Sequence, residues 1–460
     1  MASATNLTVR GIDQRRYNYQ SVFGRVNYNI DQTYLLNLTF RRDGSSRFGP
    51  GKQFGNFGAI GAGWIFTNEN FIKDGLSFLS YGKLRGSYGT TGNDQIGDYQ
   101  YLDTWGSTTF PYGGSSGLNP TRVYNPDYSW EINKKLELAL ELGFLDDKIL
   151  FTANYYNNRS SNQLIGYTLS SQSGFTSYTA NLPAKVQNSG LEFDLNTTNI
   201  QSRDFTWTTN FNLSLPKNKL LEYPNLESSG DARSYEVGQS IRMIKGYQFT
   251  GINPQTGMPE FLDVDKDGNV SSPNDQVVMG ETMPKFFGGL SNQLSYKNLT
   301  LDFFLQFVKQ ESITNDWGPL VGVLGSMNNK DVSALDRWRS PGDITNIPRP
   351  SATSSNPANT AFRNYYRSSD AAWGDASYIR LKNVSLTYDL SSLTNKWNLS
   401  GTSVFVQGQN LLTFTNYKGL DPEINGFDRR FVFPINPFGS VRSQAIPVLK
   451  TVTIGLKLAL

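Results

Sequence analysis

The sequence predicts an all-β protein whose strands form an antiparallel transmembrane β-barrel with long loops. Three observations carry this prediction. About thirteen segments alternate strictly between apolar and polar residues, many of them are ten or more residues long, and the connections between them are either very short or very long. Strands of soluble proteins usually contain about five or six residues, so both the length and the regularity of these segments point to a membrane setting.

The composition excludes several classes of protein. The 460 residues include 42 Lys and Arg, 39 Asp and Glu, no His and no Cys. Without Cys, disulfides, cysteine-ligated zinc and thiol catalysis are excluded. Without His, Ser-His-Asp triads, histidine bases and histidine metal ligands are excluded. The net charge of +3 is spread thinly, so we expect no nucleic-acid partner. Because most familiar catalytic mechanisms are absent, we do not expect an enzyme.

Segment 205–215, FTWTTNFNLSL, illustrates the alternation. Phe205, Trp207, Phe211 and Leu213 fall on one face of a strand, and Thr, Asn and Ser residues fall on the other. A helix would distribute the same residues around its circumference. The predicted strands lie near 20–31, 33–42, 54–66, 78–89, 135–145, 148–159, 188–199, 204–215, 286–296, 298–309, 378–390, 402–414 and 448–460.

The connections fall into two size classes. Asn29–Thr33 and Asp146–Lys148 join consecutive strands tightly, whereas 90–134, 216–285, 310–377 and 415–447 are very long. Short turns at one end and long loops at the other are typical of outer-membrane barrels. Each strand would turn its apolar face to lipid and its polar face to water. No segment approaches eighteen apolar residues, so we expect no transmembrane helix.

One predicted strand contains a change of phase. In 378–390 the apolar positions run through Ile379 and Leu381, and then continue at Val384 and Leu386. A shift of one residue would turn the later side chains to the wrong face unless a bulge absorbs it. We therefore predict a β-bulge near Lys382–Asn383.

The sequence resembles the SusC/RagA-type TonB-linked outer-membrane proteins, along nearly its whole length. The resemblance rests on the order and spacing of several stretches rather than on any one of them. These stretches are YLLNLTFRRDGSSRFGP (34–50), GAGWIFTNENF (61–71), KLRGSYGTTGNDQIGDYQY (83–101), NPDYSWEINKKLELALELGFLDDKILFTANYYNN (125–158), GFTSYTANLPAKVQNSGLEFDL (174–195), RWRSPGDITNIPRP (337–350), WGDASYIRLKNVSLTYDL (373–390) and GQNLLTFTNYKGLDPEI (408–424).

The resemblance implies a barrel of about 22 strands with a plugged lumen, located in the bacterial outer membrane. Members of this family import nutrients, commonly oligosaccharides or peptides, with energy delivered through TonB. A surface lipoprotein that resembles SusD typically covers the barrel. Function in this chain would accordingly be TonB-dependent uptake without covalent chemistry.

Relative to that pattern, we find no plug segment and no TonB box in residues 1–460. About thirteen strands would also leave two edges unpaired in lipid, where no water can satisfy the backbone. We therefore expect residues 1–460 to be the C-terminal portion of a barrel, with the plug and the remaining strands supplied by a separate N-terminal chain.

Segment 263–275, DVDKDGNVSSPND, resembles an EF-hand loop. Asp263, Asp265 and Asp267 occupy ligand positions 1, 3 and 5, and Asn269 at position 7 offers its backbone carbonyl. Position 12 carries Asn instead of a bidentate acid, and Asp275 follows one residue late. Hard oxygen ligands suit Ca²⁺, and affinity without the bidentate acid would be weak. The alternative is a solvated turn shaped by Asp and Gly.

Aromatic residues of the long loops are candidates for contact with a substrate, because their rings could stack on sugar rings. Packing within the loops, or against a lid protein, is the alternative. The candidates are Trp105, Trp317, Tyr365, Tyr366 and Trp373.

Two other functions stay open on the sequence alone. One is a secreted β-rich adhesin or carbohydrate-binding protein, and the other is a hydrolase on a β scaffold. Both would bury their apolar strand faces against a second layer of the same molecule, whereas a barrel would leave them open to lipid.

Overall fold

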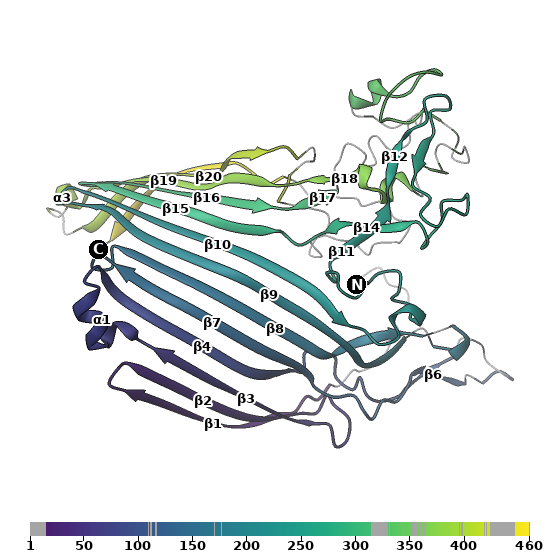
Figure 1. Ribbon diagram of the computed structural model, residues 1–460, viewed down its shortest axis with the longest axis horizontal. Coiled ribbons are helices and arrows are strands. Elements are labelled where there is room, and N and C mark those ends of the chain that lie inside the picture. Colours follow the sequence, from purple (N-terminus) through teal and green to yellow (C-terminus); the bar gives the residue numbers. More distant parts are fainter. Residues whose placement is uncertain are drawn as a thin grey trace, which may run out of the picture.

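The computed structural model is built around one antiparallel sheet (Figure 1). The structure describes residues 15–459 except 109, 111–112, 116, 170, 176, 314–329, 331, 352, 354–356, 358–359, 362–364, 395, 397–398, 418, 420 and 424–446. The strands of this sheet are β1 (Tyr19–Ile30), β2 (Tyr34–Ser45), β3 (Phe54–Trp64), β4 (Leu79–Asn93), β7 (Glu131–Phe144), β8 (Ile149–Thr168), β9 (Ser177–Gln201), β10 (Phe205–Glu222), β15 (Phe286–Tyr296), β16 (Leu299–Lys309), β19 (Tyr378–Asp389), β20 (Ser400–Thr415) and β21 (Thr451–Ala459).

The thirteen strands pair in the order in which they occur along the chain. Every pairing is antiparallel, and each predicted segment corresponds to one of these strands. The all-β prediction is therefore confirmed. Three strands are much longer than predicted: β8, β9 and β10 contain 20, 25 and 18 residues. About 9–11 residues cross a bilayer, so these three strands extend well beyond it.

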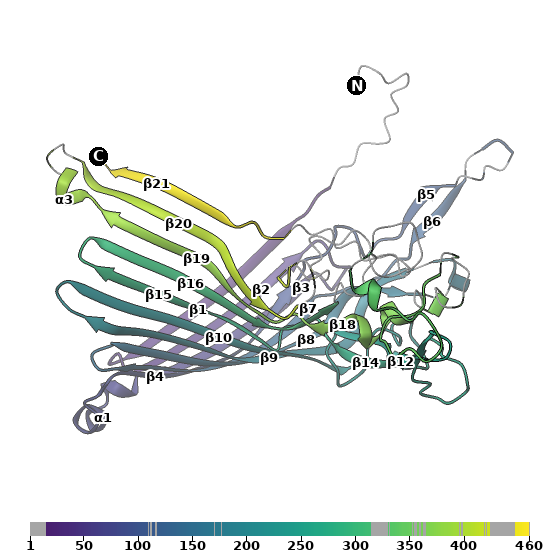
Figure 2. The same ribbon diagram turned by 90° about the horizontal axis from the view of Figure 1, so that it is seen from above.

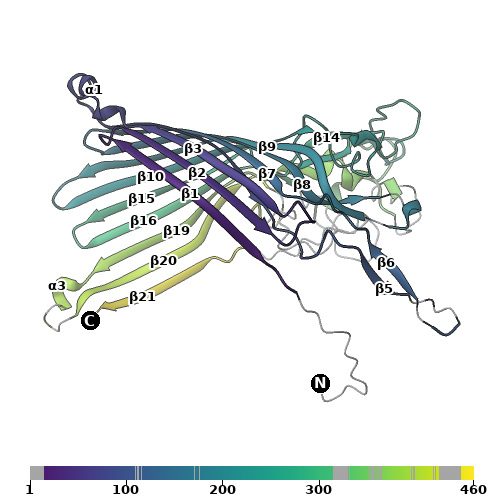
Figure 3. The same cartoon turned by 90° about the horizontal axis from the view of Figure 1, so that it is seen from below.

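The sheet curves into a trough, with β1 along one rim and β21 along the other (Figures 2 and 3). Among the described strands, β1 pairs only with β2 and β21 only with β20. The remaining backbone groups of both rim strands are open along their length. Two open rims are what the sequence analysis expects of a partial barrel, whose closure requires further strands.

One face of the sheet carries an unbroken set of apolar side chains, which we call the apolar face. The strand registers place these residues directly opposite one another from strand to strand. One such row runs through Ile30, Tyr34, Trp64, Leu84, Leu140, Ala153, Phe193 and Leu213. A second runs through Leu142, Phe151, Leu195, Phe211, Leu290, Leu305, Leu381 and Leu412.

No second layer of described residues covers the apolar face. Val26 is 60% exposed, Ile60 50%, Leu138 48% and Ile454 79%. A continuous exposed apolar surface of this extent is not compatible with water as the surrounding solvent. The apolar face therefore meets lipid, and the soluble sandwich that an adhesin or a hydrolase would need is not what the chain forms.

The opposite face, which we call the polar face, carries Asn, Gln, Ser, Thr and charged residues. Its side chains bond across neighbouring strands: Asn218 donates to Asn188 (2.7 Å), and Arg85 donates to Glu141 (2.7 Å). One row runs through Lys83, Glu141, Thr152, Asp194, Asn212, Gly289, Gln306, Arg380 and Thr413. Polar side chains of this kind line the water-filled interior of barrels.

The tightest connections, 31–33, 145–148, 202–204 and 297–298, all lie at one end of the sheet, which we call the short-turn end. The same end also carries 65–78 and 390–399. Left-handed backbone at Asp31 and Gln32 (φ 50° and 54°) closes 31–33 tightly, as two-residue hairpin turns require. The opposite end, the long-loop end, carries 46–53, 94–130, 169–176, 223–285, 310–377 and 416–450. The predicted tight turns and the four predicted very long loops therefore lie at opposite ends, but the prediction of only two size classes is wrong, because connections of intermediate length such as 46–53 and 65–78 occur at both ends.

The bulge predicted in the strand at 378–390 is confirmed. Leu381 and Asn383 face consecutive residues of β16, which leaves Lys382 as the extra residue. The pairing of β19 with β20, along its other edge, also shifts register between Leu381 and Asn383. Because the bulge absorbs one residue, Ile379, Leu381, Val384 and Leu386 all stay on the apolar face.

The long-loop end contains most of the buried packing. One cluster joins the extensions of β9 and β10 to the loop beyond them, and comprises Leu182, Ala184, Val186, Leu220, Tyr223 and Leu226. A second comprises Phe48, Phe57, Tyr128 and Trp130. The loop strands are β5 (Thr104–Ser107), β6 (Leu118–Arg122), β11 (Met243–Tyr247), β12 (Phe249–Ile252), β13 (Pro259–Phe261), β14 (Gln276–Glu281), β17 (Glu311–Ile313) and β18 (Trp373–Asp375).

Helices are short in this structure. The α-helices are α1 (Asn70–Gly75) and α3 (Ser391–Thr394), and the 3-10 helices include η1 (Phe66–Asn68), η2 (Ser171–Ser173), η3 (Leu226–Ser228), η5 (Val332–Asp336), η6 (Tyr366–Ser368) and η7 (Asp370–Ala372). Within the described part of the chain, none of the helices has the length and apolar character needed to span a membrane.

Because the two faces meet different surroundings, substitution by Arg should cost much more stability on the apolar face than on the polar face. Leu138 on the apolar face and Glu137 on the polar face are neighbours near the middle of β7. In the assembled protein in lipid vesicles, Leu138→Arg should lower the free energy of unfolding by about 2–4 kcal/mol, because the guanidinium enters lipid. Glu137→Arg should cost less than about 1 kcal/mol, because it stays in water. Denaturant unfolding measures both, and equal losses would contradict the assignment of the faces.

Candidate functional site at the long-loop end

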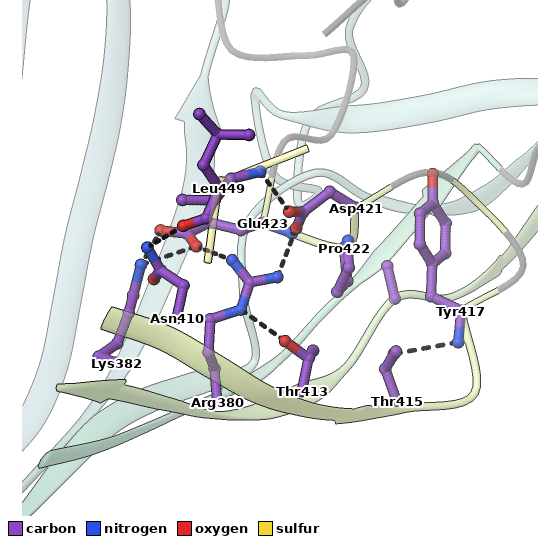
Figure 4. A network of polar contacts seen from close by, with 12 residues as sticks. Arg380, Lys382, Asn410, Thr413, Thr415, Tyr417, Asp421, Pro422, Glu423 and Leu449 are labelled. Atoms are coloured by element: carbon purple, nitrogen blue, oxygen red, sulfur yellow. Dashed lines mark hydrogen bonds and ion pairs between the residues drawn. The ribbon is translucent and has the colours of Figure 1, made fainter. Parts of the chain in front are cut away.

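The long-loop end brings the polar face of the sheet together with the loops that follow it. The best-defined contact of this kind involves Arg380 and Lys382 of β19, Thr413 of β20, and Asp421 and Glu423 of the following loop (Figure 4). Arg380 is 3% exposed and Asp421 is 6% exposed. This arrangement is a buried ionic network at the base of the loops, which we call the loop anchor.

Every polar atom of the Arg380 guanidinium has a defined partner in the loop anchor. Its Nη2 donates to Asp421 Oδ1 (2.6 Å), its Nη1 donates to Glu423, and its Nε donates to Thr413 Oγ1 (2.9 Å). Lys382 Nζ reaches Glu423 Oε1 at 2.6 Å. Arg380 and Lys382 are two residues apart in β19, so strand alternation places both on the polar side of the sheet.

Asp421 fixes the start and the end of its loop together. Its Oδ1 accepts from the backbone N–H of Glu423 (2.9 Å), and its Oδ2 accepts from Val448 (3.1 Å). Burial raises the pKa of Asp421, but the bond from Arg380 and the two backbone N–H groups outweigh burial, so the pKa lies below its ordinary value. A lowered pKa contributes stability that is present above about pH 3.9 and is lost as the pH falls through the lowered value.

A second set of contacts ties the neighbouring loop to the same place. Gln310, the first residue after β16, donates through Nε2 to Pro422 O at 2.6 Å. Glu311 accepts from Lys285 (3.0 Å) and from the indole of Trp373 (3.1 Å). The roots of three long loops are therefore bonded to one another.

Aromatic rings join the two longest loops further from the sheet. Tyr247 and Tyr365 meet edge-on with ring centroids 5.0 Å apart, and Phe249 meets Tyr366 in the same way at 5.0 Å. Phe261 lies 5.6 Å from Tyr365. The backbone N–H of Phe249 also donates to Asp370 (2.8 Å). The loops 223–285 and 310–377 thus form one packed unit.

The aromatic residues predicted to contact a substrate differ in their accessibility. Trp105 of β5 is 58% exposed. Tyr365 and Trp373 are half-buried, and Trp373 bonds to Glu311. Tyr366 is 0% exposed, so its ring presents no surface to a ligand and serves loop packing, the alternative that the sequence left open. Trp317 lies outside the described residues.

The acidic loop lies between β13 and β14, and it turns sharply on itself. One carboxylate oxygen from each of Asp263, Asp265 and Asp267 lies within 4.8 Å of the other two. Gly268 has φ +88°, a left-handed value that glycine adopts without strain. The carboxylate of Asp263 accepts from the backbone N–H groups of Lys266 (2.7 Å) and Gly268 (2.8 Å).

Asp275 holds this loop together from within. It is 0% exposed. Its two oxygens accept from the backbone N–H groups of Val264 (2.6 Å) and Ser271 (2.7 Å). The N–H of Ser271, and after it that of Val264, hold the pKa of Asp275 below its ordinary value against the opposing effect of burial. Asp275 therefore serves as an internal brace, apart from the three clustered carboxylates.

The chemistry available at this end is non-covalent: hydrogen bonding, charge and ring contact. The loop anchor was not among the predicted site residues. A signal for it existed, since the stretch GLDPEI places two acids in a loop that follows a strand pair carrying Arg380 and the phase slip at Lys382. Sequence spacing gave no indication that these groups meet.

Comparison with known proteins agrees with this architecture. The family described as "TonB dependent receptor-like, beta-barrel" matches residues 2–411. TonB-dependent receptor P3 of Formosa agariphila is 32% identical over 434 residues, covering 88% of this chain and 42% of that protein. TonB-dependent receptor SusC of Bacteroides thetaiotaomicron is 26% identical over 436 residues, covering 89% and 42% respectively.

Among solved structures, the RagAB peptide transporter superposes with a TM-score of 0.78 at 26% identity, covering 99% of this chain and 49% of that chain. The chain thus spans a little less than half the length of the relatives it matches. The resemblance to SusC/RagA-type proteins is confirmed. The chain belongs to the TonB-dependent receptor-like β-barrel family and is an outer-membrane protein of the SusC-like kind.

Proposed function

We propose that this chain forms the C-terminal wall and outer loops of a TonB-dependent importer that takes up oligosaccharides or peptides. A plug and further strands complete the barrel, and TonB acts through that plug. A SusD-like surface lipoprotein covers the loops. Substrate is captured between the loops and this lid, and then passes along the polar face once the plug is displaced.

The single observation that carries this proposal is the division of one sheet into a lipid-facing and a water-facing side, with organised loops at one end. Short turns mark the periplasmic end and long loops the extracellular end. Support for a peptide as substrate comes from the similarity to a protein titled a peptide transporter. Support for an oligosaccharide comes from the exposed indole of Trp105, which suits stacking on a sugar ring.

We also propose that the acidic loop binds Ca²⁺ through Asp263, Asp265 and Asp267, with the backbone carbonyl of Asn269 as a further ligand. The proximity of the three carboxylate oxygens supports this site. Bound Ca²⁺ would neutralise charges that otherwise repel one another, and would stiffen the loop. Asp275 would act in this site by bracing the loop.

Uptake tests the importer directly. Cells that carry the assembled protein should accumulate labelled oligosaccharides or a labelled peptide mixture, and an uncoupler of the membrane potential should abolish accumulation. The protein should require detergent for extraction, migrate in a heat-dependent manner on gels, and co-purify with a lipoprotein. Extraction as a soluble protein, or uptake that the uncoupler leaves unchanged, would contradict the proposal.

Trp105 and Tyr366 should separate substrate contact from packing. Trp105→Ala should leave the melting temperature unchanged and remove a ring contact of about 0.5–1.5 kcal/mol, which weakens substrate affinity roughly two- to twelvefold. Tyr366→Ala should instead lower the stability of the loop unit by about 3–5 kcal/mol, because it empties a buried site. Substrate titration and thermal unfolding of the two variants measure these effects. Unchanged affinity in Trp105→Ala would exclude Trp105 from the substrate path.

Calorimetry tests the metal site. Titration of the assembled protein with Ca²⁺ should release heat with a dissociation constant on the order of 10⁻⁴–10⁻³ M, as in extracellular modules. The double variant Asp263→Asn, Asp265→Asn should lose this heat, while Asp146→Asn at the short-turn end should retain it. Equal heats in all three proteins, or none, would refute the site.

Proteolysis tests the loop anchor. Arg380→Met leaves Asp421 buried without its cation, and breaking a buried pair in this way costs about 3–5 kcal/mol. Limited proteolysis of the assembled protein should therefore cut within 416–450 much faster than in the unsubstituted protein. Arg85→Met removes a more exposed polar-face arginine and serves as the control. If both variants resist cleavage equally, the anchor does not hold the loop.

A further inference from the structure

The connection between β3 and β4, residues 65–78, is the longest of the described connections at the short-turn end. It contains η1 and α1 and projects from the end of the sheet (Figures 1 and 3). A hairpin turn of two or three residues would join these strands equally well. We call this segment the foot, and its length indicates a role beyond closing the hairpin.

The beginning of the foot folds back onto the apolar face. Phe66 lies edge-on to Trp64, with ring centroids 5.6 Å apart. Its ring occupies the space above Gly82, where an added Cβ would come within 2.2 Å of Phe66. Gly82 faces Leu142, so it belongs to the apolar rows. Phe66 therefore adds an aromatic ring to the lipid-facing surface, at its margin near the short-turn end.

The end of the foot returns to the same surface. Phe78 stacks on Phe144, with ring centroids 6.2 Å apart and an angle of 3° between the rings. Phe144 lies opposite Ile149 at the end of the apolar rows. Phe78 nevertheless stays 53% exposed. Both ends of the foot are thus continuous with the surface that meets lipid.

A polar contact ties the foot to Tyr34 and Trp64, two aromatic residues at this margin of the apolar face. The carboxylate of Glu69 accepts from Tyr34 Oη (2.6 Å) and from Trp64 Nε1 (3.2 Å). Tyr and Trp with one apolar side and one polar group are typical of the boundary between lipid and water. The foot therefore begins at the depth of this boundary.

Between these attachments, the foot exposes an apolar side chain beside a cation. Phe71 in α1 is 67% exposed, and Lys73 is exposed two residues later. A phenylalanine this open next to water is less favourable than a buried one, because its ring keeps apolar surface in contact with water. Interfacial helices bind membranes by a similar arrangement: their phenyl rings lie in the acyl and glycerol layer, and their lysines lie at the phosphates.

We propose that the foot is a lipid anchor, in which Phe71 and Phe78 insert into the phospholipid leaflet at the short-turn end and Lys73 reaches the headgroup phosphates. This inference rests on the membrane setting argued above. It commits to lipid because the foot is continuous with the apolar face at both of its ends, and because its cation suits a phosphate layer.

Nitroxide labelling tests the anchor. The chain contains no Cys, so Phe71→Cys and Phe78→Cys each give one labelling site in it, and the unsubstituted assembled protein reports any label elsewhere. Ile60→Cys, in the middle of the apolar face, provides the lipid reference. Asn298→Cys, in the exposed turn between β15 and β16, provides the water reference at the same end. The measurement is the ratio of oxygen to nickel-chelate accessibility in phosphatidylethanolamine–phosphatidylglycerol vesicles.

The ratio at positions 71 and 78 should be several-fold higher than at 298 and should lie between those at 298 and 60. A ratio at 71 and 78 equal to that at 298, with a lipid value at 60, would overturn the anchor alone. Labels at 71 and 78 shielded from both reagents would also overturn it, because they would indicate a protein partner. A water value at 60 would overturn the membrane setting together with the anchor.

Discussion

In a lipid layer, each backbone N–H and C=O group has to find its partner within the protein, because no water is present to replace it. The sheet meets this requirement through twelve successive antiparallel pairings, each between strands that follow one another in the sheet order. The two rims of the described sheet do not meet this requirement. β1 and β21 each present an unpaired edge among the described strands, and only further strands can satisfy those groups in a membrane. The need for further strands at both rims thus follows from backbone hydrogen bonding.

The pairing of strands also decides where each kind of side chain lies. Because successive residues alternate between faces, one register error would turn a strand's apolar residues into the interior. The bulge at Lys382 avoids this error in β19, and the extra residue itself pairs with Glu423 of the loop anchor. One extra residue therefore maintains the lipid-facing row and helps to fix an extracellular loop.

The two ends of the sheet are built for different surroundings. At the long-loop end, buried charges and edge-on aromatic rings join segments that are far apart in the sequence, such as Phe249 with Tyr366. This organisation gives the described parts of the long loops a defined shape. At the short-turn end, the connections are tight except for 390–399 and the foot, in which Phe71 is exposed.

The sequence by itself determined the strands, their faces and the bulge, because alternation with a period of two residues is a local property that reads directly as one apolar face. It also located the acidic cluster Asp263–Asp267, whose spacing is local as well. It did not show that β8, β9 and β10 continue beyond the membrane. The extensions of β8 and β10 lack strict alternation, and in β9 the apolar positions Leu182, Ala184 and Val186 are out of phase with Leu191 and Phe193. Arg380 and Asp421 are 41 residues apart, and Tyr366 becomes buried against Phe249 from another loop. Tertiary structure alone decided these features, because contacts between distant loops depend on how the curved sheet brings their ends together.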